Sequence, residues 1–360
     1  MADEAREHGD EEMLEACRAL FDDITKRKMY LTGGIGSTNI GEAFTIPYDL
    51  PNDTAYAETC AAISLSFFAN RMKDLDPDAK YADIVEKTMY NGVLSGVSLD
   101  GKSFFYENPL EINLADHTRH LSCTRGERLP ITQRLEVFGC SCCPPNVTRY
   151  YAAIGETVFS YDDDRIYLHQ YMPCTAEIGG AKVAVETAYP TDGKVKITVC
   201  GAKGKRFFLR IPGWCEDFTC DRAYQTIRGY AQITVDADEF CVCADFHIRP
   251  VIVSADTRVR ADAGKVAVMW GPLVYCAEGV DNPGVNLADA RVFAAGEIRA
   301  AYCEDFRAPV LCVPVTLGSE DGGLYAPAAD RKRRPAELKL IPYFAFANRG
   351  ESDMRVWLCV

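Results

Sequence analysis

The spacing of apolar residues changes near Val158, and this change limits the possible folds most strongly. Before it, apolar residues recur at helical spacing, most clearly over 10–28. After it, short segments alternate between apolar and polar residues at intervals that suit a β-sandwich, namely 165–171, 182–185, 194–199, 206–211 and 232–235. A second β-rich block begins at Lys265, and the boundary between the two blocks falls near Pro250. The sequence therefore predicts a multidomain α+β chain divided into 1–156, 157–250 and 251–360.

Charge and cysteine content narrow the possible partners. The 360-residue chain carries 39 Lys and Arg against 52 Asp and Glu, a net charge of −13. This balance argues against nucleic acid, because phosphate contacts need clustered basic residues. No apolar run approaches the ~18 residues that span a bilayer, and the N-terminus lacks a signal-peptide pattern, so no membrane partner is expected. The 16 cysteines are then expected to be reduced thiols or metal ligands, which predicts a cytoplasmic protein.

Three cysteines fall within four residues, Cys140, Cys142 and Cys143, directly before two prolines and an apolar helical pattern. Proline is tolerated in the first helical turn, where its missing N–H would have no partner. The pattern therefore predicts thiols just before a helix start, where the positive end of the helix favours thiolates. The alternative is a tight structural turn with buried thiols, because free cysteine is common in protein cores.

A second stretch adds two carboxylates, Glu42 and Glu58, the latter two residues before Cys60. Zinc favours a tetrahedron of N, S or O ligands and prefers thiolate, so Glu58, Cys60, Cys142 and Cys143 would make one zinc site. Residues i and i+2 share a face only when the chain is extended, which places the next helix start at or after Cys60. The alternative is a set of buried thiols beside a surface glutamate.

One long irregular stretch lies next to these candidates. Residues 31–54 are rich in glycine and turn residues, and long structureless stretches inside compact domains are usually functional or disordered. The aromatic residues Phe44, Tyr48 and Tyr56 argue against disorder and favour an active-site wall. Three other residues could be metal ligands, namely His117, His120 and Cys123. No second cluster lies at a matching spacing, so we interpret them as loop residues.

Several motifs accompany the candidate ligands, at 32–37, 41–44, 49–54, 58–60, 104–110, 139–146, 209–214 and 341–343. Together they resemble the bacterial β-L-arabinofuranosidases of glycoside hydrolase family 127, from about residue 20 to the C-terminus. The resemblance implies a retaining glycosidase with an (α/α)6-toroid catalytic domain followed by β-sandwich domains. It implies release of L-arabinofuranose from arabinofuranose-containing oligosaccharides, with Zn2+ as cofactor. The implied residues are Cys142 as nucleophile, Glu42 as acid/base, Glu58, Cys60, Cys142 and Cys143 as zinc ligands, and Tyr106 in the sugar site.

Family members carry a long additional segment ahead of the point where this chain begins. The resemblance therefore implies the C-terminal portion of such an enzyme, with a partial toroid in 1–156 and an incomplete pocket. Exposed helix faces would then favour an upstream half-domain or a second copy as partner. Two other functions stay open: an inactive, zinc-stabilised carbohydrate-binding or structural remnant, and a redox or thiol-binding protein built on Cys140–Cys143.

Overall fold

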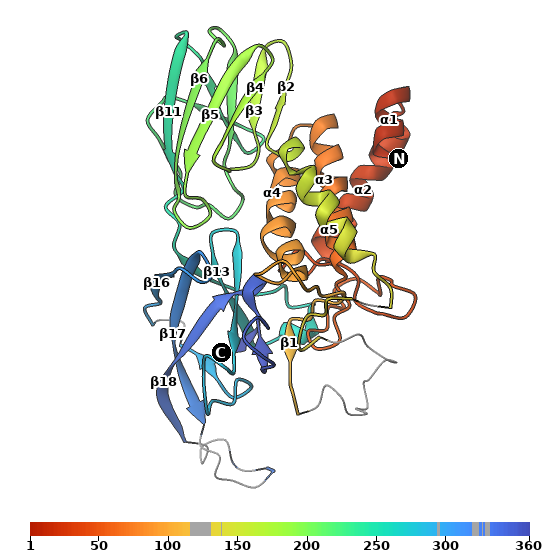
Figure 1. Cartoon of the computed structure of the whole chain (residues 1–360), viewed down its shortest axis with the longest axis vertical. Coiled ribbons are helices and arrows are strands. Elements are labelled where there is room, and N and C mark those ends of the chain that lie inside the picture. Colours follow the sequence, from red (N-terminus) through yellow and green to blue (C-terminus); the bar gives the residue numbers. More distant parts are fainter. Residues whose placement is uncertain (116–130, 138, 294–295, 319–323, 326, 328–331) are drawn as a thin grey trace. The chain divides into compact units, whose positions relative to one another are not determined.

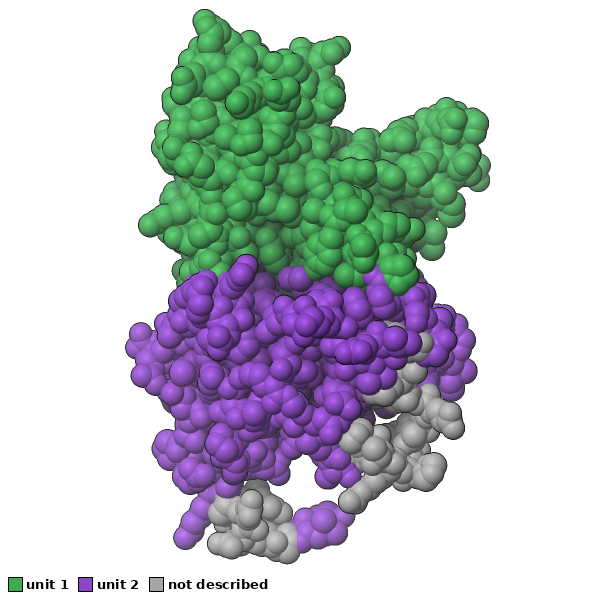
Figure 2. Space-filling model, viewed as in Figure 1, with its two compact units in different colours: residues 1–26, 63–90, 145–249 green, residues 27–62, 91–144, 250–360 purple. Residues whose placement is uncertain are grey.

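The computed structural model describes residues 1–115, 131–137, 139–293, 296–318, 324–325, 327 and 332–360 (Figure 1). His117, His120 and Cys123, the alternative metal ligands, lie outside the described residues. Each of two compact units gathers three separate segments of the chain (Figure 2): unit 1 comprises 1–26, 63–90 and 145–249, and unit 2 comprises 27–62, 91–144 and 250–360. In the described part of the chain, no helix has both the length and the apolar character needed to cross a membrane.

Five α-helices are described: α1 (Ala2–His8), α2 (Glu11–Arg27), α3 (Thr59–Leu75), α4 (Ala79–Lys87) and α5 (Cys143–Ala152). The helix predicted over 10–28 is confirmed as α2, and the helix predicted to start at or after Cys60 is α3, which begins at Thr59. Asp78 caps α4, because its carboxylate accepts the Lys80 backbone N–H at 3.0 Å. Beyond α4 the chain continues as a π-helix (Thr88–Val93) and a 3-10 turn (Leu94–Gly96).

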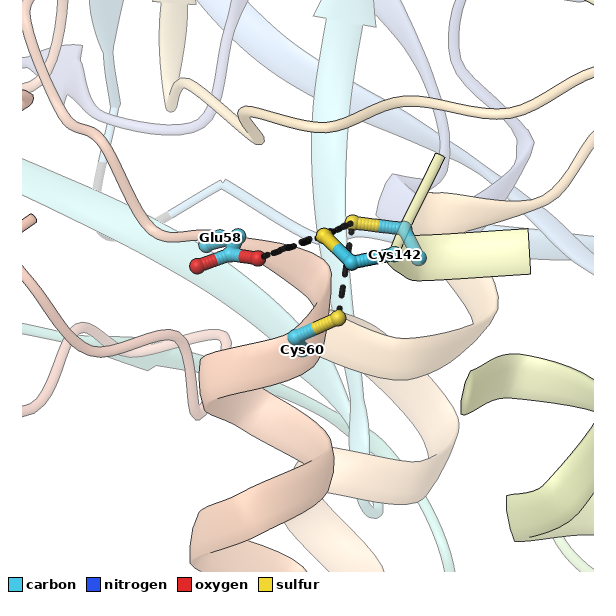
Figure 3. Close-up of side chains that lie close together, drawn as sticks. Glu58, Cys60 and Cys142 are labelled. Carbon is cyan, nitrogen blue, oxygen red and sulfur yellow. Dashed lines mark hydrogen bonds between the residues drawn. The ribbon is translucent and has the colours of Figure 1, made fainter. Parts of the chain in front are cut away.

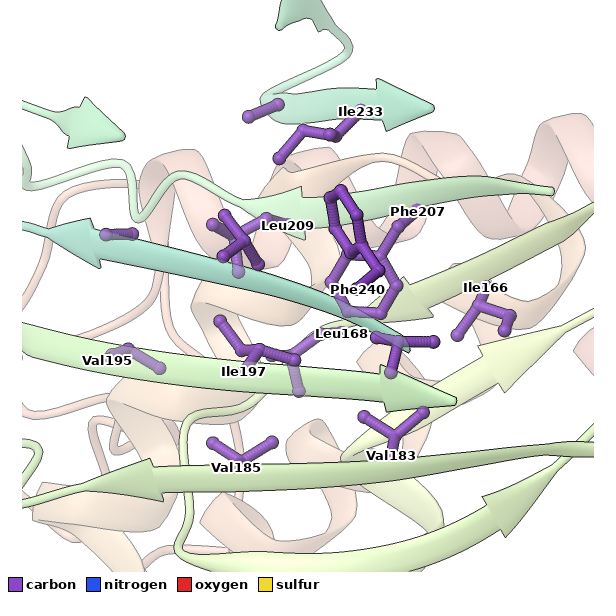
Figure 4. Packing of buried hydrophobic residues seen from close by; sticks show 14 of the residues in the cluster. Ile166, Leu168, Val183, Val185, Val195, Ile197, Phe207, Leu209, Ile233 and Phe240 are labelled. Atoms are coloured by element: carbon purple, nitrogen blue, oxygen red, sulfur yellow. The ribbon is translucent and has the colours of Figure 1, made fainter. Parts of the chain in front are cut away.

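Two five-stranded sheets in unit 1 share one apolar core (Figure 4). The first has the order β2 (Phe159–Tyr161), β3 (Arg165–Leu168), β7 (Arg206–Arg210), β10 (Tyr230–Thr234) and β9 (Gln225–Ile227). The second has the order β4 (Cys174–Ile178), β5 (Ala181–Thr187), β6 (Lys194–Cys200), β11 (Glu239–Asp245) and β8 (Thr219–Cys220). Strand alternation explains the core, because Val195, Ile197 and Val199 of β6 are buried while its lysines are exposed.

Unit 2 contains a ten-stranded sheet. Its main path is β1 (Glu111–Ile112), β19 (Met354–Arg355), β14 (Leu273–Glu278), β18 (Arg333–Pro342), β17 (Ala308–Gly318), β15 (Arg291–Val292), β20 (Leu358–Cys359), β13 (Lys265–Trp270) and β12 (Pro250–Val253), and β16 (Arg299–Cys303) pairs with β17. Side-chain amides attach the irregular segments of unit 2 to this sheet. The Asn91 amide donates to the Pro272 carbonyl at 2.9 Å and accepts the Val274 N–H at 2.8 Å. These bonds anchor the segment that leads into residues 97–115.

The predicted fold class, a partial (α/α)6-toroid followed by β-sandwich domains, is wrong. Among the described residues more lie in strands than in α-helices, and the five α-helices cover fewer than half of residues 1–156. Periodicity identified helices but not their arrangement. The segments 28–58 and 97–115 form loops and isolated β-bridges within unit 2, and β1 joins its large sheet, instead of completing a ring of helices. The predicted boundaries at residues 156 and 250 stay a prediction.

Candidate functional site

Glu58, Cys60, Cys142 and Cys143 converge in unit 2, with one ligand atom from each lying within 4.8 Å of all the others. We call this group the Glu–Cys cluster. The Cys142 thiol donates to Oε1 of Glu58 at 3.4 Å, and the Cys60 and Cys143 sulfurs are 3.6 Å apart. Figure 3 shows Glu58 and Cys60 at the start of one helix, with Cys142 facing them from the chain before another. The four residues predicted from the sequence as ligands of one metal ion thus lie together in the structure.

The starts of α3 and α5 position these side chains. Helix α3 begins at Thr59, one residue earlier than the spacing argument allowed. Glu58 still precedes the helix, so its side chain can turn toward that of Cys60 in the first turn. The Thr59 N–H donates to the Tyr106 carbonyl at 3.0 Å, and a Cβ on Gly96 would lie only 2.4 Å from Cγ2 of Thr59. Gly96 therefore allows the close packing that fixes this helix start.

At the other side of the cluster, α5 begins at Cys143, with Pro144 and Pro145 in its first turn. This confirms the prediction of thiols at a helix start that tolerates proline. Cys143 is buried, whereas Cys142 and Cys140, which precede the helix, are exposed. The turn therefore points the Cys143 thiol into the protein interior and leaves the preceding thiol, Cys142, accessible to a ligand.

The electrostatics of the Glu–Cys cluster favour a bound cation. Burial raises the pKa of Cys142 to about 12, and hydrogen bonding with Cys60 together with burial raises the pKa of Cys143 far above its ordinary value. A divalent cation would reverse these effects, because it stabilises thiolates and a carboxylate directly. Three sulfurs and one oxygen are also a donor set that soft or borderline metals prefer. The four residues therefore fit a metal ion.

Glu42 lies on a turn next to the cluster. Thr38 and Ala43 form an isolated antiparallel bridge, and between them Gly41 and Glu42 have positive φ angles of 69° and 50°. Glu42 is exposed, but its Oε1 accepts hydrogen bonds from the buried hydroxyls of Tyr56 at 2.7 Å and Tyr106 at 2.9 Å. The turn thus holds an exposed carboxyl group against two buried tyrosines.

Tyr106 connects this carboxyl group to the Glu–Cys cluster. Its hydroxyl also hydrogen-bonds the Cys142 thiol, so one hydroxyl lies between Glu42 and Cys142. Burial raises the pKa values of Tyr56 and Tyr106, which keeps both phenols protonated as donors. The sequence indicated Tyr56 only as part of an aromatic wall. Its contact with Glu42 depends on a loop fold that spacing does not reveal.

Models of one protein family match three successive segments of the chain. The catalytic domain of "Beta-L-arabinofuranosidase, GH127" matches residues 1–156, its middle domain matches 165–243, and the "Glycoside hydrolase family 127 C-terminal domain" matches 250–359. The resemblance implied only the C-terminal portion of such an enzyme. That expectation is corrected, because all three domains of the family are matched.

Curated and solved proteins agree with these models. The non-reducing end β-L-arabinofuranosidase of Bifidobacterium longum subsp. longum is 38% identical over 97% of this chain and 56% of its own length. The crystal structure of Ara127N-Se, a GH127 β-L-arabinofuranosidase from Geobacillus stearothermophilus T6, matches with a TM-score of 0.90 and 39% identity, covering 100% of this chain and 58% of that one. The GH127 β-arabinofuranosidase BT3674 matches with a TM-score of 0.86 and 33% identity over the same shares. The chain spans somewhat more than half the length of these relatives.

Proposed function

Because the chain belongs to glycoside hydrolase family 127, we propose that it releases L-arabinofuranose from β-L-arabinofuranosides, with Cys142 as nucleophile and Glu42 as general acid and base. One observation carries this proposal: the Tyr106 hydroxyl contacts both Glu42 and Cys142, and Cys142 belongs to the Glu–Cys cluster. Two groups that share one hydroxyl lie within roughly 6 Å of each other. Retaining glycosidases place their two catalytic groups about 5–5.5 Å apart, so the arrangement favours retention.

Glu58, Cys60, Cys142 and Cys143 would hold the metal ion, which we propose is zinc on the grounds of the Cys3Glu donor set. When bound, zinc would supply the positive charge that keeps the thiols deprotonated and in place. The protein contributes the helix starts that orient the donors. Cys142 is the exposed thiol of the four donors, and this accessibility is what a nucleophile needs.

In the first step, the Cys142 sulfur attacks the anomeric carbon of the arabinofuranoside. A C–S bond forms while the glycosidic C–O bond breaks, and the electron pair of that bond moves to the leaving oxygen. Glu42 donates its proton to this oxygen, so the leaving group departs as an alcohol. The product of the step is a glycosyl thioether on Cys142 and a carboxylate at Glu42.

In the second step, the Glu42 carboxylate takes a proton from water as the water oxygen attacks the anomeric carbon. The C–S bond breaks, and its electron pair returns to the Cys142 sulfur. Two displacements at the same carbon retain the anomeric configuration. Tyr106, whose hydroxyl donates to Glu42, lies where it would also line the sugar site.

The defining experiment combines metal analysis with trapping of the intermediate. The purified chain should contain about one zinc per chain and should hydrolyse 4-nitrophenyl β-L-arabinofuranoside. Glu42→Gln should keep its zinc, and with this good leaving group it should accumulate a sugar adduct on Cys142 that mass spectrometry locates. Cys142→Ser should lose both zinc affinity and activity, and it serves as the comparison for the adduct.

Three results would change the assignment. An adduct on Cys143 or Glu58 would show that Cys142 is not the nucleophile. Loss of zinc from Glu42→Gln would show that Glu42 is a ligand and not the acid. A zinc-loaded wild-type chain that binds arabinofuranosides without turning them over would support the alternative, an inactive carbohydrate-binding remnant.

A further inference from the structure

The Glu42 carboxyl group is exposed on its turn, but two buried phenols hold one of its oxygens. Tyr56 and Tyr106 are each only 5% exposed, and both hydroxyls donate to Oε1. The terminal torsion of a glutamate is soft, so an exposed carboxyl group would otherwise rotate freely. A carboxyl oxygen has two lone pairs, and two donors occupy both of those on Oε1. The proton of a neutral Glu42 is therefore directed to Oε2.

The two phenols differ in how many acceptors they serve. Each hydroxyl has a single proton to donate. Tyr106 has Glu42, Tyr56 and Cys142 within hydrogen-bonding reach, so its proton is shared among three acceptors. The Tyr56 hydroxyl donates to Oε1 of Glu42 at 2.7 Å, the shorter of the two contacts. Tyr56 can therefore hold Glu42 in place while the Tyr106 proton turns toward sulfur.

The backbone of Tyr56 is fixed on both sides. The Asn108 N–H donates to the Tyr56 carbonyl at 3.2 Å, and the next residue, Ala57, donates its N–H to the Gly36 carbonyl at 2.8 Å. The Tyr56 ring also packs against the Tyr106 ring, with centroids 5.9 Å apart. A donor with a buried ring and a fixed main chain is preorganised to orient a mobile group.

We propose that Tyr56 is a positioning residue that fixes the Glu42 carboxyl group, so that Oε1 faces the two phenols and Oε2 carries the proton delivered to the leaving oxygen. The inference rests on the proposed role of Glu42 as general acid. Tyr106 then has a second role. Its hydroxyl can donate its hydrogen bond to either Glu42 or Cys142, while Tyr56 keeps the carboxyl group in place. Tyr56→Phe removes only the hydroxyl that holds Glu42.

The first test needs no turnover. Crystal structures of the zinc-loaded wild type and of Tyr56→Phe should show the Glu42 carboxyl group fixed in the former, and rotated or split between positions in the latter. Tyr275→Phe is the matched control, because Tyr275 is also buried in unit 2 and donates to a backbone carbonyl, that of Pro309, at 2.7 Å. A carboxyl group that keeps its position and its Oε1 contact with Tyr106 in Tyr56→Phe would overturn the proposal.

The second test uses leaving groups of different quality. A misplaced acid slows only substrates that need protonation, so Tyr56→Phe should lower kcat/KM on methyl β-L-arabinofuranoside about 10- to 100-fold and on the nitrophenyl glycoside by at most about 2-fold. Zinc content should stay at the wild-type level. An equal loss on both substrates would show a merely structural role for Tyr56. An inactive wild type would contradict the proposed function, whereas the crystallographic test would still decide the role of Tyr56.

Discussion

Two buried polar clusters, one in each unit, look alike in composition but differ in charge balance. In unit 1, fully buried Arg210 bonds Asp83 at 2.6 Å and also pairs with Glu86 of α4. Burial lowers the pKa of Arg210, but the carboxylates of Glu86 and Asp83 outweigh it and hold the pKa well above its ordinary value. In unit 2, the described hydrogen bonds of the Glu–Cys cluster join thiols to one another and to a carboxylate.

The two clusters differ as a structural cluster differs from a candidate binding site. The unit 1 cluster carries its own cation, and its neighbours complete it, since the Trp214 indole N–H donates to Glu86 at 3.0 Å. The unit 2 cluster consists of acidic groups, and the raised pKa values of Cys142 and Cys143 keep these thiols neutral unless a cation is bound. Burial and hydrogen bonding alone do not distinguish the two. What distinguishes them is that the unit 1 cluster contains a cationic side chain, Arg210, whereas the four residues of the Glu–Cys cluster are all acidic.

The largest expected effect follows from removing the proposed zinc ion. Apparent binding free energies of structural zinc are about 10–16 kcal/mol, so stripping the metal with a chelator should destabilise unit 2 by roughly 5–10 kcal/mol. Hydrogen exchange monitored by mass spectrometry should show faster exchange in the peptides around Cys60 and Cys143. The peptides of β6 and β11 in unit 1 serve as the internal control. Unchanged hydrogen exchange at the starts of α3 and α5 would show that the Glu–Cys cluster holds no structural metal ion.

Arg210→Met tests the self-contained cluster. The variant leaves Asp83 and Glu86 buried without their cation, and breaking a buried ion pair in this way costs about 3–5 kcal/mol. Urea denaturation should show this loss, while zinc content stays normal because Arg210 supplies no donor to the Glu–Cys cluster. Adding Glu86→Gln to Arg210→Met should recover part of the stability. A loss below about 1 kcal/mol would show that the unit 1 cluster is not held by its charge balance.

Local spacing predicted much of the site, and tertiary contacts account for what it missed. The i, i+2 pair Glu58 and Cys60 and the two prolines after Cys143 are short-range signals. The prolines indicated the start of α5, and the pair placed the start of α3 one residue too late. The pairing of Arg210 with Glu86 joins residues 124 positions apart, so no local pattern reveals it. The arrangement of the helices was also mispredicted, because the toroid was inferred from the family resemblance, and periodicity could not test it: it reports which face of a helix is buried but not what covers that face. The contact between Tyr56 and Glu42 likewise arises from a loop.

Asp262 of unit 2 is another buried carboxyl group, and it differs from those above because its hydrogen-bond partner is the neutral Asn52. Its Oδ1 accepts the Asn52 amide N–H at 2.7 Å, and burial raises its pKa to about 6 from an ordinary 3.8. The folded state therefore holds this proton more tightly than the unfolded state. Stability is fully present below about pH 4 and falls by about 3 kcal/mol as the pH rises to about 6.

Denaturation at pH 4, 5, 6 and 7 measures this loss. Asp262→Asn should remove the decrease between pH 4 and pH 6 while keeping an acceptor for Asn52. Asp256→Asn is the control, because Arg258 lowers the pKa of Asp256 and its titration falls below this window. The same slope in wild type and Asp262→Asn would mean that Asp262 is already ionised at pH 4 in the folded protein.

The smallest expected effect concerns Cys140, which lies two residues before Cys142 but outside the Glu–Cys cluster. It is exposed, and exposed side chains away from specific contacts usually change stability by no more than about 0.5 kcal/mol when replaced. Cys140→Ser should therefore leave zinc content and stability unchanged. In the zinc-loaded wild type, iodoacetamide should modify exposed Cys140 while Cys60 and Cys143 are protected, and a chelator should make these two more reactive. Both experiments compare Cys140 with thiols of the Glu–Cys cluster, so they separate metal ligation from mere exposure. Loss of zinc from Cys140→Ser would show that Cys140 is a ligand. The assignment of the accessible nucleophile would then have to change.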